Sequence, residues 1–106
     1  MQGEVEATIE RLEKVVFDAR RILGEYIPGD WSEETLETEG VIKKEPFGIV
    51  LGISPFNYPL FISSTKMIPA ILAGNAVILK PSSMTPIPPL LFGRILELAG
   101  FPKTSF

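Results

Sequence analysis

The sequence of 106 residues contains no cysteine and no histidine. These absences exclude disulfide bonds, thiolate metal sites, a cysteine nucleophile and imidazole acid–base catalysis from within this chain. Two of the side chains that enzymes use most often in catalysis are therefore missing. The sequence also lacks the basic region and apolar core of a signal peptide, so we assign the protein to the cytoplasm by default.

Long apolar runs suited to a bilayer are missing as well. Residues 46–65 carry no charge, but Pro46, Pro55 and Pro59 interrupt them. In a bilayer these prolines would break a helix and leave backbone groups unpaired, so we expect no membrane association.

Basic charge is scarce in the first half of the chain. Residues 1–45 hold 12 acidic and 6 basic residues, a net charge of −6, whereas residues 46–106 hold 1 and 4, a net charge of +3. The second half could attract a phosphate-bearing ligand. It lacks the dense Lys and Arg runs that follow a nucleic-acid backbone, so we expect no nucleic-acid partner.

The pattern of the first 39 residues predicts a helix followed by an irregular connecting segment. An apolar stripe with spacings of three and four predicts a long amphipathic helix over about residues 3–23, ended by Gly24. Its members are Val5, Ile9, Leu12, Val16, Ala19 and Leu23. We interpret this stripe as a face that packs on a neighbouring surface. Residues 25–39 are acidic and rich in turn formers, which predicts an irregular connection.

From residue 40 onward, strands and helices alternate. A short extended segment over 40–46 precedes a β-branched apolar strand over 49–54, of the kind buried on both sides in a parallel sheet. A helix begins near Pro59 and ends at Gly74–Asn75. A buried strand follows over 76–79, and then a second amphipathic helix that ends at Gly100.

This order of elements predicts an α/β fold in which the two buried strands are parallel, because the helix between them returns the chain to the same edge. Ligands of such sheets bind beyond the carboxyl ends of the strands. Those ends carry Ser54-Pro55-Phe56-Asn57 and Lys80-Pro81-Ser82-Ser83. We therefore expect these two loops to lie side by side and to form the candidate site.

Several runs in register resemble the landmarks of the aldehyde dehydrogenase superfamily. They are Glu45-Pro46-Phe47-Gly48, Ser54-Pro55-Phe56-Asn57-Tyr58-Pro59, Lys66-Met67-Ile68-Pro69-Ala70, Ala73-Gly74-Asn75, Val77-Ile78-Leu79-Lys80-Pro81-Ser82 and Ala99-Gly100-Phe101-Pro102. The resemblance covers residues 45–102, while residues 1–44 match only in pattern. Within the superfamily, the sequence of residues 54–59 is most similar to that of the semialdehyde and non-phosphorylating glyceraldehyde-3-phosphate enzymes.

The resemblance implies a partial Rossmann-like parallel sheet, a β-α-β-α unit, preceded by the long amphipathic helix. Residues 45–106 would be the first part of the NAD(P)-binding domain. Residues 1–44 would be an outer helix and the approach to the family's oligomerisation strand. The family oxidises aldehydes with a cysteine thiolate, NAD(P)+ and a glutamate. Neither catalytic group maps onto this chain, because both lie downstream of the matched segment, so we expect the chain to be a fragment.

Asn57 matches the family's asparagine whose amide holds the oxyanion formed when the thiolate adds to the aldehyde. An amide suits this task because it donates a hydrogen bond without supplying a competing proton. From spacing alone, the favoured interpretation of Asn57 is a cap of the turn before the Pro59 helix, and it is the resemblance that favours the oxyanion role.

The resemblance also implies a partial NAD or NADP site. Lys80 matches the lysine that contacts the adenosine ribose hydroxyls, and without the flanking match it would be a solvated loop lysine. Ser54, Pro55 and Phe56 would contribute backbone and wall contacts. Ser83 stands where many NAD+-preferring relatives carry a glutamate, which favours NADP+ acceptance; its alternative role is that of a turn residue.

The expected partners are a dinucleotide and an aldehyde in the whole enzyme, with assembly as a homo-oligomer. Two alternatives remain open. The chain could be a non-catalytic module that self-associates through exposed sheet edges, or one half of a split enzyme completed by a second polypeptide.

Overall fold

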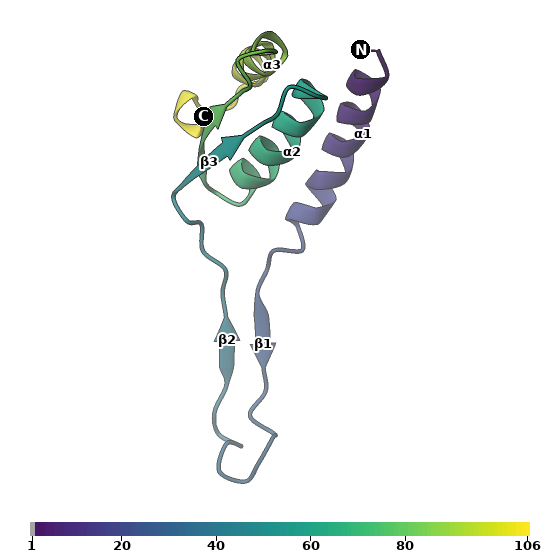
Figure 1. The fold of residues 1–106 in the computed structure, drawn as a ribbon. Helices are drawn as coiled ribbons and strands as arrows, with labels where there is room; N and C mark the ends of the chain where they lie inside the picture. The colour runs from purple at the N-terminus through teal and green to yellow at the C-terminus, as the bar shows by residue number, and fades with distance from the viewer. Residues whose placement is uncertain (1) are drawn as a thin grey trace.

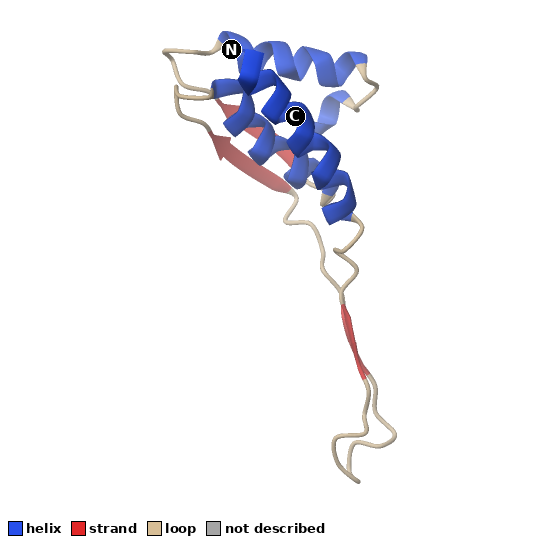
Figure 2. Cartoon of the chain, turned by 90° about the vertical axis from the view of Figure 1, so that its right-hand side faces the viewer, coloured by secondary structure: helices blue, strands red, loops and turns tan. Residues whose placement is uncertain are grey.

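The computed structural model describes residues 2–106 as a helical body with a narrow arm (Figure 1). The radius of gyration is 18.4 Å, against roughly 13 Å for a compact chain of this length. The arm therefore projects well beyond the body, as Figure 2 also shows. The body contains α1 (Gln2–Ala19), β3 (Ile49–Ile53), α2 (Pro59–Leu72), β4 (Ala76–Lys80), α3 (Ile87–Leu98) and the 3-10 helix η1 (Lys103–Ser105). The arm contains β1 (Glu25–Ile27) and β2 (Gly40–Ile42).

Helix α1 is shorter than the predicted segment and turns a partly different face to the body, although Leu12 of the predicted stripe does pack against the core. It ends at Ala19, and the next two backbone N–H groups, of Arg20 and Arg21, donate to carbonyls three residues back. The buried residues are Thr8 and Val15, which face α2, whereas Val5, Ile9 and Val16 of the predicted stripe are exposed. The prediction that the helix packs on a neighbouring surface is confirmed, but the stripe assigned to that contact was wrong in part.

The arm corrects the prediction that residues 25–39 are irregular throughout. Tyr26 lies opposite Val41 in an antiparallel pair of strands. Gly24 permits this pairing, because a Cβ atom there would lie 2.0 Å from the carbonyl oxygen of Ile42. The partner segment is more than a dozen residues away in sequence, so local composition could not reveal the strand. Thr35 organises the loop between the strands by donating to the Gly29 carbonyl at 2.8 Å.

Strands β3 and β4 form the parallel pair that the sequence predicts, with Val50 opposite Val77. Asn75 fastens the start of this pair. Its Oδ1 accepts from the Gly48 N–H at 3.1 Å, and its Nδ2 donates to the Ala70 carbonyl at 3.0 Å. The carboxyl end of α2 and the first residues of both strands are thereby joined.

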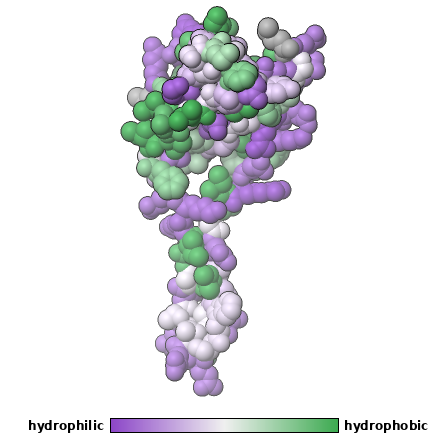
Figure 3. Space-filling model, in the orientation of Figure 1, coloured by the Kyte–Doolittle hydropathy of each residue, from purple (hydrophilic) through white to green (hydrophobic). Residues whose placement is uncertain are grey.

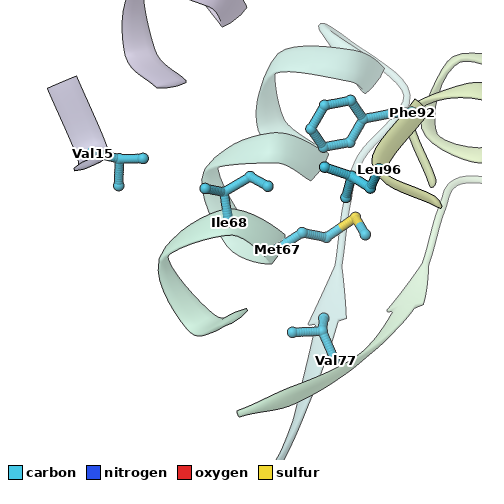
Figure 4. Packing of buried hydrophobic residues seen from close by; sticks show 6 residues of the cluster. All are labelled: Val15, Met67, Ile68, Val77, Phe92 and Leu96. Atoms are coloured by element: carbon cyan, nitrogen blue, oxygen red, sulfur yellow. The ribbon is translucent and has the colours of Figure 1, made fainter. Parts of the chain in front are cut away.

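Helix α2 covers one face of this pair and forms the centre of the core. Figure 4 shows Met67 and Ile68 projecting from α2 between residues of α1, β4 and α3. The buried apolar cluster consists of Val15, Met67, Ile68, Val77, Phe92 and Leu96. Gly52 is buried beneath α2, where an added Cβ would approach the Lys66 Cβ to 3.5 Å. This is an ordinary contact distance, so Gly52 lies directly against α2 with room for no more than a methyl group.

The opposite face of the strand pair is open. Ile49, Leu51 and Ile53 are 69%, 61% and 58% exposed, and Ile78 beside them is exposed as well. The prediction that β3 is buried on both sides was therefore wrong for this chain, because only one layer of helices covers the sheet. Figure 3 shows apolar side chains gathered on the strand side of the body. Among residues 2–106, no helix has the length and apolar character needed to cross a bilayer.

Candidate functional site

The loops that follow β3 and β4 lie side by side, as the sequence predicts. The Ser54 N–H donates to the Lys80 carbonyl at 3.1 Å, which continues the parallel pairing beyond the strands. Further along, Thr85 Oγ1 donates to the Phe56 carbonyl at 3.1 Å. These two bonds tie the loops together at the rim of the sheet.

Ser54 faces inward at the base of this rim. It is 4% exposed, and its Oγ accepts a hydrogen bond of 2.9 Å from Ser63 Oγ, which is itself 0% exposed. A buried hydroxyl without such a partner would be costly, so the pair satisfies two polar groups at once. The Ser54 side chain therefore anchors the loop to α2, and only its backbone can contribute to the rim.

Tyr58 turns the chain from the loop into α2. Its backbone adopts the left-handed conformation, with φ 49° and ψ 55°. This region is unfavourable for a bulky residue, and such conformations cost roughly 1–3 kcal/mol where the surroundings enforce them. The rigid ring of Pro59 follows as the first residue of the helix, where a missing N–H has no consequence.

Glu4 of α1 occupies the N-terminus of α2. Its Oε1 accepts from the N–H groups of Leu60 at 2.8 Å and Phe61 at 3.0 Å. Sequence reasoning missed this residue, because the contact joins positions more than 50 apart and no local pattern marks it. It also corrects the interpretation of Asn57 as a helix cap. Among residues 2–106, the side chain that caps α2 is that of Glu4.

Asn57 and Ser83 are exposed on the two loops, and Lys80 is exposed at the end of β4. Lys80 Nζ lies 3.5 Å from the carbonyl oxygen of Pro81, so its ammonium group stays at the surface of the rim. The Ser82 hydroxyl accepts from the Met84 N–H at 3.2 Å, which shapes the turn that carries Ser83. The rim thus presents an amide, an ammonium group and a hydroxyl to solvent.

Pro55 and Phe56 form the exposed outer wall of the first loop. An aromatic ring that is 55% exposed beside polar loop atoms suits contact with a planar or sugar-containing ligand. Within the described part of the chain, no group of three or more acidic residues forms a potential metal site. The chemistry available at this rim is therefore hydrogen-bond donation and positive charge.

The family model described as "Aldehyde dehydrogenase family" matches residues 1–106. Aspartate-semialdehyde dehydrogenase 1 of Pseudomonas canavaninivorans is 39% identical over 103 residues, which are 97% of this chain and 22% of that protein. The 3-sulfolactaldehyde dehydrogenase of Priestia aryabhattai is 38% identical over 102 residues, 96% of this chain and 21% of that protein.

Solved structures of enzymes contain a segment with the same fold as this chain. NADP-dependent glyceraldehyde-3-phosphate dehydrogenase from Bacillus halodurans C-125, crystallised with NADP, superposes with a TM-score of 0.86 at 34% identity. The match covers 94% of this chain and 21% of that one. The chain therefore spans about a fifth of the length of the relatives it matches.

Proposed function

The chain belongs to the aldehyde dehydrogenase family, and we propose that it forms the part of an NAD(P)+-dependent enzyme that holds the reacting oxyanion and one end of the coenzyme. Such an enzyme oxidises an aldehyde to a carboxylic acid. The observation that carries this proposal is the rim at which the loop of Asn57 and the loop of Lys80 are joined, with a 3.1 Å bond from the Ser54 N–H to the Lys80 carbonyl.

Asn57 serves as the oxyanion donor in this proposal. In the family's reaction a thiolate adds to the aldehyde carbon, and the carbonyl oxygen becomes negatively charged. The Asn57 amide donates a hydrogen bond to that oxygen, which lowers the energy of the addition. Since the 106 residues contain no cysteine, the thiolate belongs to another part of the whole enzyme.

Lys80 holds the coenzyme by hydrogen bonds to the adenosine ribose. Its exposed ammonium group at the end of β4 fits ribose or phosphate oxygens. Pro55 and Phe56 supply the neighbouring wall, and Ser54 supplies backbone contacts. When bound, the dinucleotide accepts the hydride of the oxidation.

The N-terminus of α2 does not suit the coenzyme phosphates. In dinucleotide folds with the usual glycine fingerprint, the pyrophosphate binds at the first helix N-terminus of the β-α-β unit. Here the Glu4 carboxylate accepts from the same backbone N–H groups. A phosphate would meet a negative charge there, so we assign to this chain the ribose end of the coenzyme.

Coenzyme choice follows from Ser83. A glutamate at this position would accept a hydrogen bond from the ribose 2′-hydroxyl and repel a 2′-phosphate. Ser83 removes that repulsion, and Lys80 is free to pair with the added phosphate. We therefore propose NADP+ as a coenzyme used at least as well as NAD+. The crystallised relative from Bacillus halodurans was bound to NADP.

In the whole enzyme, residues 45–106 would begin a Rossmann-like NAD(P)-binding domain, and residues 1–44 would lead into an oligomerisation region. The arm supports an assembly role. A two-stranded antiparallel pair is marginally stable alone, and Tyr26 and Val41 on this arm are exposed. We propose that the arm packs against another subunit of a homo-oligomer. The names of the semialdehyde and glyceraldehyde-3-phosphate relatives support the assignment of the chain to that branch of the family.

The test is a chimera in which this chain replaces the matching fifth of the aspartate-semialdehyde dehydrogenase of Pseudomonas canavaninivorans. Asn57→Ala should lower kcat by roughly 100-fold to 1000-fold, as expected for loss of an oxyanion donor. Lys80→Met should mainly raise the KM for the coenzyme. An Asn57→Ala chimera with unchanged kcat would overturn the assignment of Asn57.

A second candidate function is self-association without catalysis, favoured by the open apolar face of β3. A third arrangement is a split enzyme in which a second polypeptide covers this face. Size measurements with and without a co-purified chain discriminate between the two.

A further inference from the structure

The first turn of α2 has all its backbone donors accounted for. Pro59 has no N–H, and the N–H groups of Leu60 and Phe61 both donate to Glu4 Oε1, at 2.8 and 3.0 Å. The next N–H, of Ile62, donates to the Tyr58 carbonyl at 3.0 Å. Helix ends fray when their first backbone N–H groups lack acceptors. The first turn of α2 therefore depends on a single carboxylate from α1 to stay helical.

Glu4 is held rigidly enough to act as a distant cap. One turn further along α1, Thr8 Oγ1 donates to the Glu4 carbonyl at 2.7 Å, and Thr8 is buried. Three turns along, Val15 belongs to the same buried cluster as Ile68 of α2. Packing of α1 along α2 therefore fixes the carboxylate over the helix end.

The capped turn is separated from Asn57 by two constrained residues. Tyr58 has a left-handed backbone, and Pro59 has a φ restricted by its ring. Among residues 2–106, we find no hydrogen bond that holds the Asn57 amide itself. Its position consequently depends on the backbone, and the backbone on its helical side depends on Glu4.

From this geometry we propose that Glu4 is a positioning residue for Asn57: it fixes the start of α2 and thereby the direction of the Asn57 amide. The inference rests on the proposed function, because positioning matters for catalysis only if Asn57 is the oxyanion donor. Glu4 itself does not reach substrate or coenzyme in this assignment. It acts through the backbone between Leu60 and Asn57.

Hydrogen exchange of single amides tests the cap on the 106-residue chain, independently of any activity. Glu4→Ala should accelerate exchange at Leu60 and Phe61 by about tenfold or more, because both amides lose their acceptor. Glu4→Gln keeps an acceptor oxygen at the same reach and should restore most of the protection. Exchange at Asn75, whose N–H donates to the Ala70 carbonyl at 3.0 Å, should stay unchanged and report that α2 remains folded.

Glu6→Ala is the matched control. Glu6 lies half a turn away on the exposed side of α1, so its replacement removes the same charge without touching α2. Protection at Leu60 and Phe61 should equal that of the unmodified chain. Equal acceleration by both alanine variants would overturn the cap, since the effect would then come from general loss of charge.

Kinetics of the chimera described above test the positioning step. Glu4→Ala should lower kcat about tenfold, less than loss of the donor itself, while the KM for the coenzyme changes less than about twofold. Glu4→Gln should recover most of kcat. Faster exchange at Leu60 with kcat unchanged would overturn the positioning role. If the chimera with Glu4 intact were inactive, the proposed function would fail. The exchange experiment would still show whether Glu4 caps α2.

Discussion

Ser63 Oγ donates a hydrogen bond of 2.9 Å to Ser54 Oγ, and both side chains are almost completely buried between β3 and α2. This bond links the first residue of the loop after β3 to the second turn of the helix that follows the loop. It therefore closes the loop that carries Asn57 at its base. The rim depends on this buried pair as well as on the Glu4 cap.

Replacing Ser63 by Ala should lower the free energy of unfolding by about 1–3 kcal/mol, because the Ser54 hydroxyl would stay buried without a partner. The double variant Ser54→Ala, Ser63→Ala should lose less than the sum of the single variants. Urea unfolding followed by circular dichroism measures these differences. Ser83→Ala on the exposed loop is the control and should change stability by less than about 0.5 kcal/mol. Additive losses in the double variant would contradict the pairing.

Asn75→Ala should also lower the free energy of unfolding, by about 1–3 kcal/mol, since the N–H of Gly48 and the carbonyl of Ala70 both lose a partner. Asn75→Asp accepts from Gly48 but cannot donate to Ala70, so it should recover part of the loss at most. The same urea titration compares the variants. Full stability of the aspartate variant would show that the bond to Ala70 is unimportant.

The isolated chain should self-associate through the open face of β3. Burial of Ile49, Leu51 and Ile53 between two copies removes apolar surface from water, which favours association. Leu51→Lys should weaken association at least about tenfold, because a charge would have to be buried. Light scattering across the micromolar range measures this. Phe17→Lys on the exposed side of α1, outside both the arm and the open face of β3, is the control and should leave association unchanged. A clean monomer for the unmodified chain would contradict association through β3.

The purified chain should not reduce NAD+ or NADP+ in the presence of aldehydes, because it has no thiolate to form the covalent adduct. Absorbance at the wavelength of the reduced coenzyme provides the assay. The unmodified chimera is the positive control. Robust turnover by a contaminant-free sample of residues 1–106 would contradict the proposal that the catalytic thiolate belongs to another part of the whole enzyme.

Ser83→Glu in the chimera should shift relative kcat/KM from NADP+ toward NAD+. The new carboxylate would repel the 2′-phosphate of NADP+ and accept a hydrogen bond from the 2′-hydroxyl of NAD+. Ser83→Gln is the control, because glutamine is similar in size to glutamate but carries no charge. A glutamate at the neighbouring Ser82 would be unsuitable, because Ser82 Oγ accepts from the Met84 N–H. An unchanged ratio in the glutamate variant would remove Ser83 from the coenzyme assignment and leave it as a turn residue.

The residue pattern by itself determined the order of elements in the second half of the chain. Pro59, Gly74 and Gly100 mark helix boundaries through backbone geometry that is local to each residue, and β3 and β4 appear as short apolar runs between them. The motif around Asn57 and Lys80 also indicated the family, and the family model matches the whole chain.

Only the tertiary structure decided the contacts between distant segments. The β1–β2 pairing, the face of α1 that packs on α2, and the Glu4 cap all join residues far apart in sequence. Glu4 in isolation is one of many acidic residues on an amphipathic helix, and Tyr26 is one residue of an acidic connection. Their partners are set by how the helices and strands pack together, because a hydrogen bond or a strand pair needs geometry that no local sequence pattern contains.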